Sequence, residues 1–186
     1  MKPRIRSTSG LAALLAAFSI TVCAENTPPG YIDFGKLAPP IGSGEFIEVH
    51  VKSNLIGMAA RLVEKIEPDA AQLLRGLQLV RVNVIGLNDE NRSDMEKRIQ
   101  TIREELDSKG WERIVTAQKK DEDISVYLKT RGEEAVEGLV VTVLQARREA
   151  VLVNIVGDIR PEKVALVGEK LNIDPLKKIG QHLEKR

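Results

Sequence analysis

Alternating apolar and polar side chains mark the first regular element of the chain. In "FIEVHVKS", residues 46–53, an apolar side chain recurs at every second position from Ile47 onward. This is typical of a half-buried β-strand, because successive side chains point to opposite faces of a sheet. The segment "DISVYLKT", residues 123–130, repeats the same order of isoleucine, valine, aromatic ring, branched residue, lysine and hydroxyl. We predict two equivalent strands, in which His50 and Lys52 correspond to Tyr127 and Lys129.

A second pair of segments carries the same internal asparagine. "VRVNVIG", residues 80–86, returns as "VLVNIVG", residues 151–157. Together with the first match, this indicates a duplicated strand-connection-strand unit. Asparagine is disfavoured in strands and must be hydrogen-bonded when buried, so we predict structural roles for Asn83 and Asn154. Each would bond backbone, or the equivalent asparagine across a pseudo-twofold axis; a pair of ligand-contacting amides is the alternative.

Apolar residues at helical spacing predict three helices between these strands. The first spans 55–66, with a stripe of Leu55, Met58, Ala59, Leu62, Val63 and Ile66. Pro68 opens a short second helix that runs to residue 77. A long charged helix near 90–108 carries the stripe Met95, Ile99, Ile102 and Leu106. Two further helices are predicted after Pro161 and Asp174, with stripes Val164, Val167, Leu171 and Leu176, Ile179, Leu183.

The second half of the chain is dominated by hairpin patterns. Residues 111–118 are predicted to pair with the strand at 123–130, and the β-branched segment 138–146 is predicted to pair with 150–156. The expected order is β-α-α-β-α-β-β-β-β-α-α. We therefore expect an α+β fold with a mixed or largely antiparallel sheet and helices packed on one face.

The first 24 residues have the layout of a secretory signal peptide. Three basic residues precede an apolar run over 11–22, which is too short to span a bilayer, since a spanning helix needs about 20 apolar residues. Val22 and Ala24 suit ordinary cleavage before Glu25. The alternative is a lipoprotein anchored through Cys23. We expect a periplasmic or secreted protein with no transmembrane helix in the mature chain.

Residues 25–44 contain two Pro-Pro pairs and four glycines, which favour an extended arm over a helix. Tyr31, Ile32, Phe34 and Leu37 are apolar enough to dock this arm on the domain; a solvated linker is the alternative. Residues 45–186 are predicted to form a single α+β domain.

Charge and cysteine content narrow the functional classes. Without the leader, 25 basic and 27 acidic side chains remain, and a net charge near −2 gives no argument for binding nucleic acid. The single cysteine lies in the leader, so the mature chain would hold no disulfide and no thiol nucleophile.

Recognisable catalytic and metal-binding patterns are missing from the sequence. There is no G-x-S-x-G, Walker A or H-E-x-x-H motif. The two histidines, His50 and His182, are far apart in sequence, and the carboxylates of Asp121, Glu122 and Asp123 fit a solvated turn better than a Ca²⁺ loop. We expect no catalytic residues, no metal site and no cofactor.

Several segments resemble the bacterial DUF4252 family, small exported proteins of unknown function. They are "GYIDFGKL", "FIEVHV", "GWERIV", "DEDISVYLK", "GLVV" and "EAVLVNIVGDIRPE". The resemblance covers nearly the whole mature chain and implies export and one α+β domain. It supplies no catalytic residues. It also implies a genetic neighbourhood of extracytoplasmic-function sigma factors and their membrane regulators.

The leading functional hypothesis is a non-enzymatic interaction module with a protein partner in the cell envelope. Its predicted contact surface is the sheet face near His50, Lys52, Tyr127 and Lys129, or the apolar arm. One alternative is a small-molecule or lipid-binding module, with a pocket lined by Met58, Leu62 and the valines of the asparagine strands. A hydrolase would need His50 beside a serine or a carboxylate.

Overall fold

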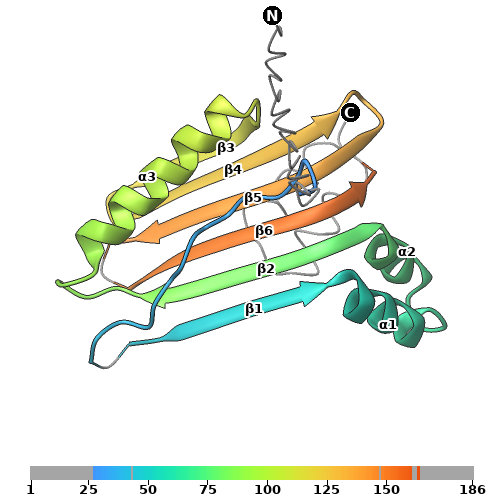
Figure 1. The fold of residues 1–186 in the computed structure, drawn as a ribbon, viewed down its shortest axis with the longest axis horizontal. Coiled ribbons are helices and arrows are strands. Elements are labelled where there is room, and N and C mark those ends of the chain that lie inside the picture. Colours follow the sequence, from blue (N-terminus) through green and yellow to red (C-terminus); the bar gives the residue numbers. More distant parts are fainter. Residues whose placement is uncertain (1–26, 43, 147, 161–162, 164–186) are drawn as a thin grey trace, which may run out of the picture.

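The computed structural model describes residues 27–42, 44–146, 148–160 and 163. Its centre is one six-stranded sheet with the strand order β1-β2-β6-β5-β4-β3 (Figure 1). All five strand pairings are antiparallel, so the predicted α+β class is confirmed and its sheet is antiparallel throughout. The leader with Val22, Cys23 and Ala24, the helices predicted after Pro161 and after Asp174, and His182 lie outside the described residues.

The helices and strands follow the predicted order as far as the described residues reach. They are β1 Phe46–Lys52, α1 Ser53–Val63, α2 Pro68–Gly76, β2 Leu77–Gly86, α3 Arg92–Ser108, β3 Glu112–Lys119, β4 Glu122–Arg131, β5 Ala135–Gln145 and β6 Glu149–Ile159. No described helix has the length and apolar character needed to cross a membrane.

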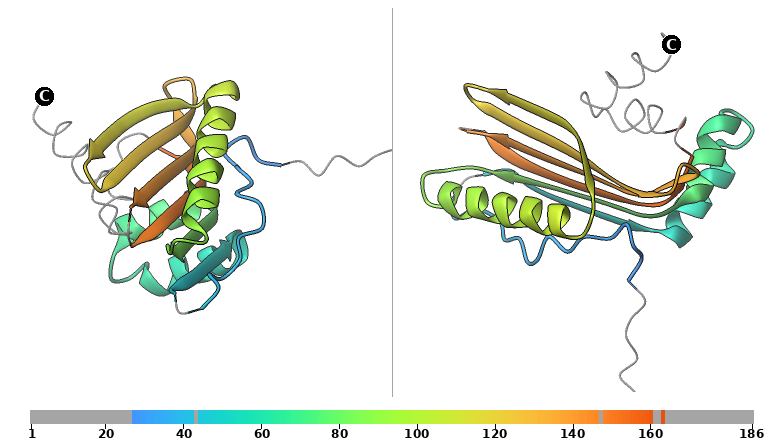
Figure 2. Two further views of the ribbon diagram at one scale, coloured as in Figure 1. Left: turned by 90° about the vertical axis from the view of Figure 1, so that its left-hand side faces the viewer. Right: turned by 90° about the horizontal axis from the view of Figure 1, so that it is seen from above.

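Two apolar clusters pack on opposite faces of the sheet. The face that we call the arm face is covered by α3 and by the N-terminal arm, residues 27–42 (Figure 2). The valine face carries the alternate side chains, among them Val80, Val82 and Val153. Ile56 of α1 and Leu73 of α2 join the cluster on the valine face. The expectation that all helices pack on one face is therefore not met, because α1 and α2 sit at one end of the sheet and turn inward on the other side from α3 (Figure 2).

The two asparagine strands are direct neighbours. β2 and β6 run antiparallel with Val82 opposite Val153, and these two valines hold the same place in the repeated segments. A local twofold relation therefore holds for this pair of strands. It does not extend to the predicted duplication, because β1 pairs directly with β2 whereas β5 separates β4 from β6. The strand-connection-strand unit is not repeated in space.

Helix α1 buries a different side from the one predicted. Its buried residues are Ile56 and Ala60, whereas Leu55, Met58 and Leu62 are exposed. Both sides of α1 are apolar, so the helical period identifies the helix without deciding which side faces the core. The pocket expected around Met58 and Leu62 is not formed by these side chains.

Candidate functional site

The arm is held on the sheet by buried polar contacts. Ile32 and Phe34 are fully buried, and they join the apolar cluster between the sheet and α3. The Arg98 side chain donates from Nε and Nη2 to the carbonyl oxygen of Phe34. Arg81, which lies 5.4 Å above the Phe34 ring, donates to the carbonyl oxygen of Gly35. These contacts make the arm part of the folded domain.

The two asparagines have different partners. The Asn154 side chain accepts a hydrogen bond from the Ile32 backbone and donates to the carbonyl oxygens of Gly30 and Leu139. Asn83 accepts only from Nε of Arg81, and its Nδ2 is buried without a partner. Asn154 thus bonds backbone, which is one of the two predicted arrangements. Asn83 bonds a side chain, and the two amides do not bond one another.

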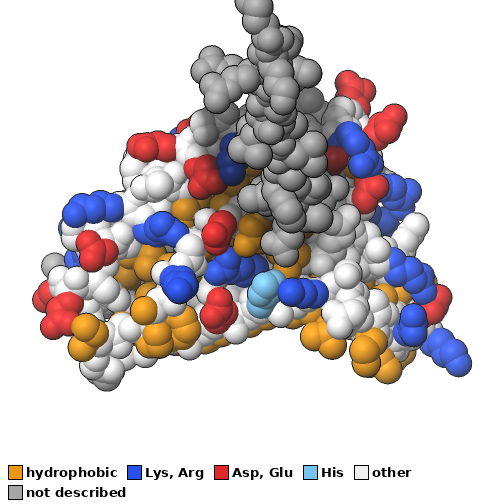
Figure 3. All heavy atoms as spheres, in the orientation of Figure 1, with side chains coloured by type: hydrophobic (Ala, Val, Ile, Leu, Met, Phe, Trp, Pro, Cys, Tyr) orange, Lys and Arg blue, Asp and Glu red, His pale blue; other side chains and the backbone are white. Residues whose placement is uncertain are grey.

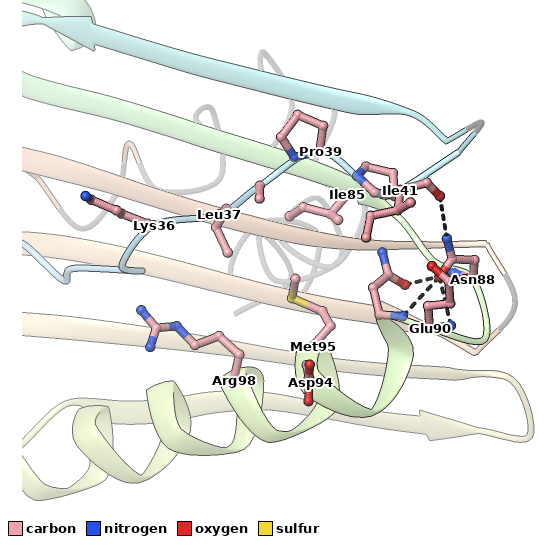
Figure 4. A pocket seen from close by; sticks show the side chains of 13 residues that line it. Lys36, Leu37, Pro39, Ile41, Ile85, Asn88, Glu90, Asp94, Met95 and Arg98 are labelled. Carbon is pink, nitrogen blue, oxygen red and sulfur yellow. Dashed lines mark hydrogen bonds between the residues drawn. The ribbon is translucent and has the colours of Figure 1, made fainter.

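A groove of about 500 Å³ opens between the arm and the start of α3 (Figure 4). Lys36 and Arg98 lie at one end of it and Glu90 at the other, with Met95 and the neighbouring Asp94 between the two ends. The side chain of Asn88 donates to the carbonyl oxygen of Ile41 and so fixes the groove's far end. The residues that line the groove are charged, polar or apolar. None of them is a histidine, cysteine, serine or threonine.

Two carboxylates of the acidic turn at residues 121–123 form ion pairs. Arg103 of α3 binds the carboxylate of Asp123 with both terminal nitrogens, at 2.7 and 3.2 Å, and Lys119 pairs with Glu122. Within the described ranges, no group of three or more histidine, cysteine, aspartate and glutamate side chains is arranged to hold a metal ion. Asp123 therefore fixes α3 to the sheet.

The four residues of the predicted contact surface do not form one surface. His50 and Lys52 are exposed on β1, but β2, β6 and β5 separate them from Tyr127 and Lys129 on β4. Tyr127 is fully buried, because α3 covers its end of the arm face. Lys129 donates to the carbonyl oxygens of Lys109 and Gly110 after α3. The similarity of the two strand sequences therefore does not give them similar surroundings.

Burial raises the pKa of Tyr127 above its usual value near 10, although the nearby Arg113 guanidinium opposes part of this rise. A raised pKa in the folded state means that stability is complete below pH 10 and falls as the pH rises through the folded-state pKa. We expect Tyr127→Phe to weaken this alkaline loss, because phenylalanine has no hydroxyl that can ionise. Urea unfolding of both proteins at pH 8 and pH 11 measures the difference. Equal losses of stability at pH 11 would contradict this assignment.

β1 is the edge strand of the sheet whose register is regular. β1 pairs only with β2 among the described strands, and its register has no irregularity. The opposite edge, β3, is interrupted by a bulge between Arg113 and Val115, a feature that hinders pairing with further strands. The alternation over residues 46–53 predicts the strand β1, but it gives no sign that this strand lies at an edge.

The direction of the β1 backbone groups follows from one hydrogen bond. The Gly86 backbone N–H donates to the carbonyl oxygen of Glu45 at 2.6 Å, so Glu45 faces β2. Backbone groups alternate between the two sides of a strand. The N–H and C=O groups of Glu48 and His50 therefore point away from β2, toward the side on which no described strand pairs with β1.

Exposed apolar side chains gather on β1 and the helix that follows it. Of the eight large apolar residues that are exposed in the described part, six fall between residues 47 and 66. They are Ile47, Val49, Leu55, Met58, Leu62 and Ile66. Figure 3 shows hydrophobic side chains along the lower right margin, over α1, beside lysine and arginine side chains. The segment from β1 through α1 is thus the main candidate binding surface.

Comparison with known proteins yields one match. The model of DUF4252, a domain of unknown function, matches residues 42–167. No curated protein and no solved structure matches the chain. The matched residues include β1, α1 and every other described helix and strand.

Proposed function

Because the chain belongs to the DUF4252 family, whose function is unknown, we propose its function from its surfaces. We propose an exported, non-enzymatic interaction module of the cell envelope, which binds a partner protein by accepting a strand of that partner at the edge of β1. The observation that carries the proposal is the regular edge of β1, which has no second partner among the described strands and carries exposed Ile47 and Val49.

Strand addition uses two kinds of contact, and β1 offers both. Backbone bonds give affinity, and alternate side chains give specificity. The outward N–H and C=O groups of Glu48 and His50 can form the backbone hydrogen bonds. Ile47 and Val49 present apolar surface on the valine face, while His50 and Lys52 present polar groups on the arm face. A partner strand with a matching alternation would satisfy both faces.

Export and the envelope location rest on the leader sequence. Its basic start and the apolar run over 11–22 suit a secreted protein, and cleavage after Ala24 is the favoured form, with a lipid anchor on Cys23 as the alternative. The genetic neighbourhood implied by the family resemblance makes a membrane regulator of an extracytoplasmic-function sigma factor a candidate partner.

We expect His50→Pro to lower partner binding about tenfold or more, because proline removes an outward N–H and its ring obstructs an added strand. The change removes no bond to β2, so the domain should stay folded. The measurement is crosslinking capture of the tagged chain from native envelopes, followed by quantitative mass spectrometry. The measured mass of the recovered bait also identifies its N-terminus.

His50→Ala is the matched control, since it removes the imidazole and keeps the backbone N–H. It should retain the partner that His50→Pro loses, and both variants should keep the circular dichroism spectrum of the parent. Undiminished capture by His50→Pro would refute strand addition at β1. Equal loss by both variants would assign the contact to the imidazole instead of the backbone.

A small-molecule binding module remains the second candidate, and the groove between the arm and α3 favours it. Its volume of about 500 Å³ and its mixture of apolar and charged residues suit a small amphipathic ligand. Delipidated protein should then melt at a higher temperature in the presence of envelope lipid extract. An unchanged melting temperature would count against this candidate.

For the hydrolase hypothesis the geometry offers no support, because His50 forms no hydrogen bond with a serine or carboxylate in the described part.

A further inference from the structure

Helix α1 has an apolar stripe on its outer side as well as on its inner side. Ile56 and Ala60 face the core. On the outside, Leu55, Met58 and Leu62 are 51%, 59% and 79% exposed, and Ile66 in the following turn is 80% exposed. Residues at spacings of three and four lie on one side of a helix. The four side chains therefore form one outer stripe along α1 and its end.

Unpaired positive charge borders this outer stripe. Arg61 and Lys65 follow Met58 and Leu62 by three positions, so they stand beside them. Neither cation has an ion-pair partner within the described ranges.

Two of the carboxylates nearby form ion pairs with other cations. Glu64 pairs with Arg75 at 2.5 Å, and Asp69 pairs with Lys163 at 3.1 Å; Glu67 also has an interaction partner. The charge left uncompensated around the stripe is therefore positive.

We propose that α1 seats the protein on an anionic lipid surface. The outer stripe would enter the boundary between headgroups and acyl chains, and the side chains of Arg61 and Lys65 would reach the lipid phosphates. An apolar stripe bordered by basic residues is the pattern of helices that lie in a membrane interface, and their binding combines apolar burial with attraction to anionic lipid.

A second copy of the chain is a less suitable occupant. Two outer stripes packed against each other would bring the Arg61 and Lys65 side chains of both copies close together, and like charges oppose such contact. The stripe also contains no aromatic or hydrogen-bonding side chain that would select one protein surface. An anionic lipid surface can bury the apolar stripe and also pair its phosphates with Arg61 and Lys65.

The position of α1 in the fold permits this contact. With α2 it stands at one end of the sheet, away from α3 (Figure 2), and its outer side is not covered by any described element, as the exposure of Leu62 shows. Seating α1 on a membrane leaves the outward backbone groups of His50 on β1 as a separate surface. The proposal is therefore independent of strand addition at β1.

Flotation with vesicles tests this proposal. The protein is the processed chain beginning at Glu25, which lacks Cys23 and therefore any acyl anchor. The vesicles consist of phosphatidylcholine alone or of phosphatidylcholine with phosphatidylglycerol. We expect binding to the anionic vesicles that weakens with added salt, since about 0.1 M salt screens charges beyond about 10 Å. Met58→Ser with Leu62→Ser should reduce it about tenfold or more.

Matched variants separate the two contributions. Arg61→Gln with Lys65→Gln should reduce binding to the anionic vesicles and remove its salt dependence. Ile114→Ser and Lys120→Gln change an exposed apolar residue of β3 and an exposed lysine that follows this strand, and they should leave binding unchanged. His50→Pro should also bind the vesicles normally, which keeps this result distinct from a failure of strand addition.

Three results would overturn the proposal. The first is no binding to anionic vesicles by the parent chain. The second is equal binding by the parent and the Met58 and Leu62 variant. The third is a dimer in solution that this variant abolishes, which would assign the outer stripe to a second copy. Circular dichroism of every variant confirms that α1 is still folded before each comparison.

Discussion

Replacing Asn154 with alanine is expected to lower the free energy of unfolding by about 3 kcal/mol or more. The Asn154 side chain is fully buried and bonds three backbone groups, those of Ile32, Gly30 and Leu139. Alanine would leave these groups buried without partners, and each unsatisfied buried group costs about 1–3 kcal/mol. Two of the three belong to the arm, so the attachment of the arm should weaken as well. Urea unfolding followed by tryptophan fluorescence measures the loss.

Asn83→Ala is the natural control because the two asparagines occupy the same place in the repeated segments. Asn83 has one partner, the Arg81 guanidinium, which also contacts Asp33, Gly35 and Glu48. We expect a loss of about 1 kcal/mol, since one hydrogen bond is removed and the unpaired Nδ2 goes with it. Equal losses for the two variants would contradict the unequal roles and support the symmetrical pair that the sequence suggested.

The elements of the sheet and α3 could be predicted because their patterns are local. Alternation of apolar residues marks β1 and β4, and the stripe of Met95, Ile99, Ile102 and Leu106 marks α3, whose buried residues are these four. Short connections between β3, β4, β5 and β6 require antiparallel hairpins. A pattern that is set by neighbours in the sequence can be read from the sequence.

The candidate surfaces could not be predicted because they depend on what covers each strand. β1 and β4 have similar sequences, yet Tyr127 is buried beneath α3 and His50 is exposed at an edge. Strand order decides this difference, and strand order is not a local property. On α1, two apolar sides compete for the core, and the smaller pair, Ile56 and Ala60, lies inward. The helical period alone therefore favours the larger outer side chains for the core, and the structure shows them exposed.

The partners of the asparagines show the same limit. Burial of an asparagine in a strand predicts that it must be hydrogen-bonded, and Asn154 is. Its partners Gly30 and Ile32 lie more than 120 residues earlier in the chain, so no spacing in the sequence could identify them. The sequence predicts an extended arm that can dock on the domain. It does not show that the arm contacts β5 and β6, which only the structure reveals.

Replacing Gly138 with alanine is expected to displace the arm and to destabilise the domain by about 2–3 kcal/mol. A Cβ at this position would lie 2.5 Å from the Cα of Gly30, 2.7 Å from its carbonyl oxygen and 2.5 Å from the Trp111 ring. Backbone cannot withdraw as a flexible side chain can, and overpacking a closely packed core costs about 1–3 kcal/mol. Displacing Gly30 also strains the bond between its carbonyl oxygen and Asn154.

Trypsin cleavage at Lys36 provides the direct readout of the arm, since a detached arm exposes the backbone around this lysine. Gly57→Ala is the control: its Cβ would meet nothing within 4 Å, and alanine favours a helix by up to about 1 kcal/mol over glycine. We expect Gly138→Ala to accelerate the cleavage and Gly57→Ala to leave it unchanged. If cleavage stays slow in Gly138→Ala while stability falls, the strain is confined to β5 and Trp111. The arm would then be held by Asn154 and Arg98 without needing the close contact between the two glycines.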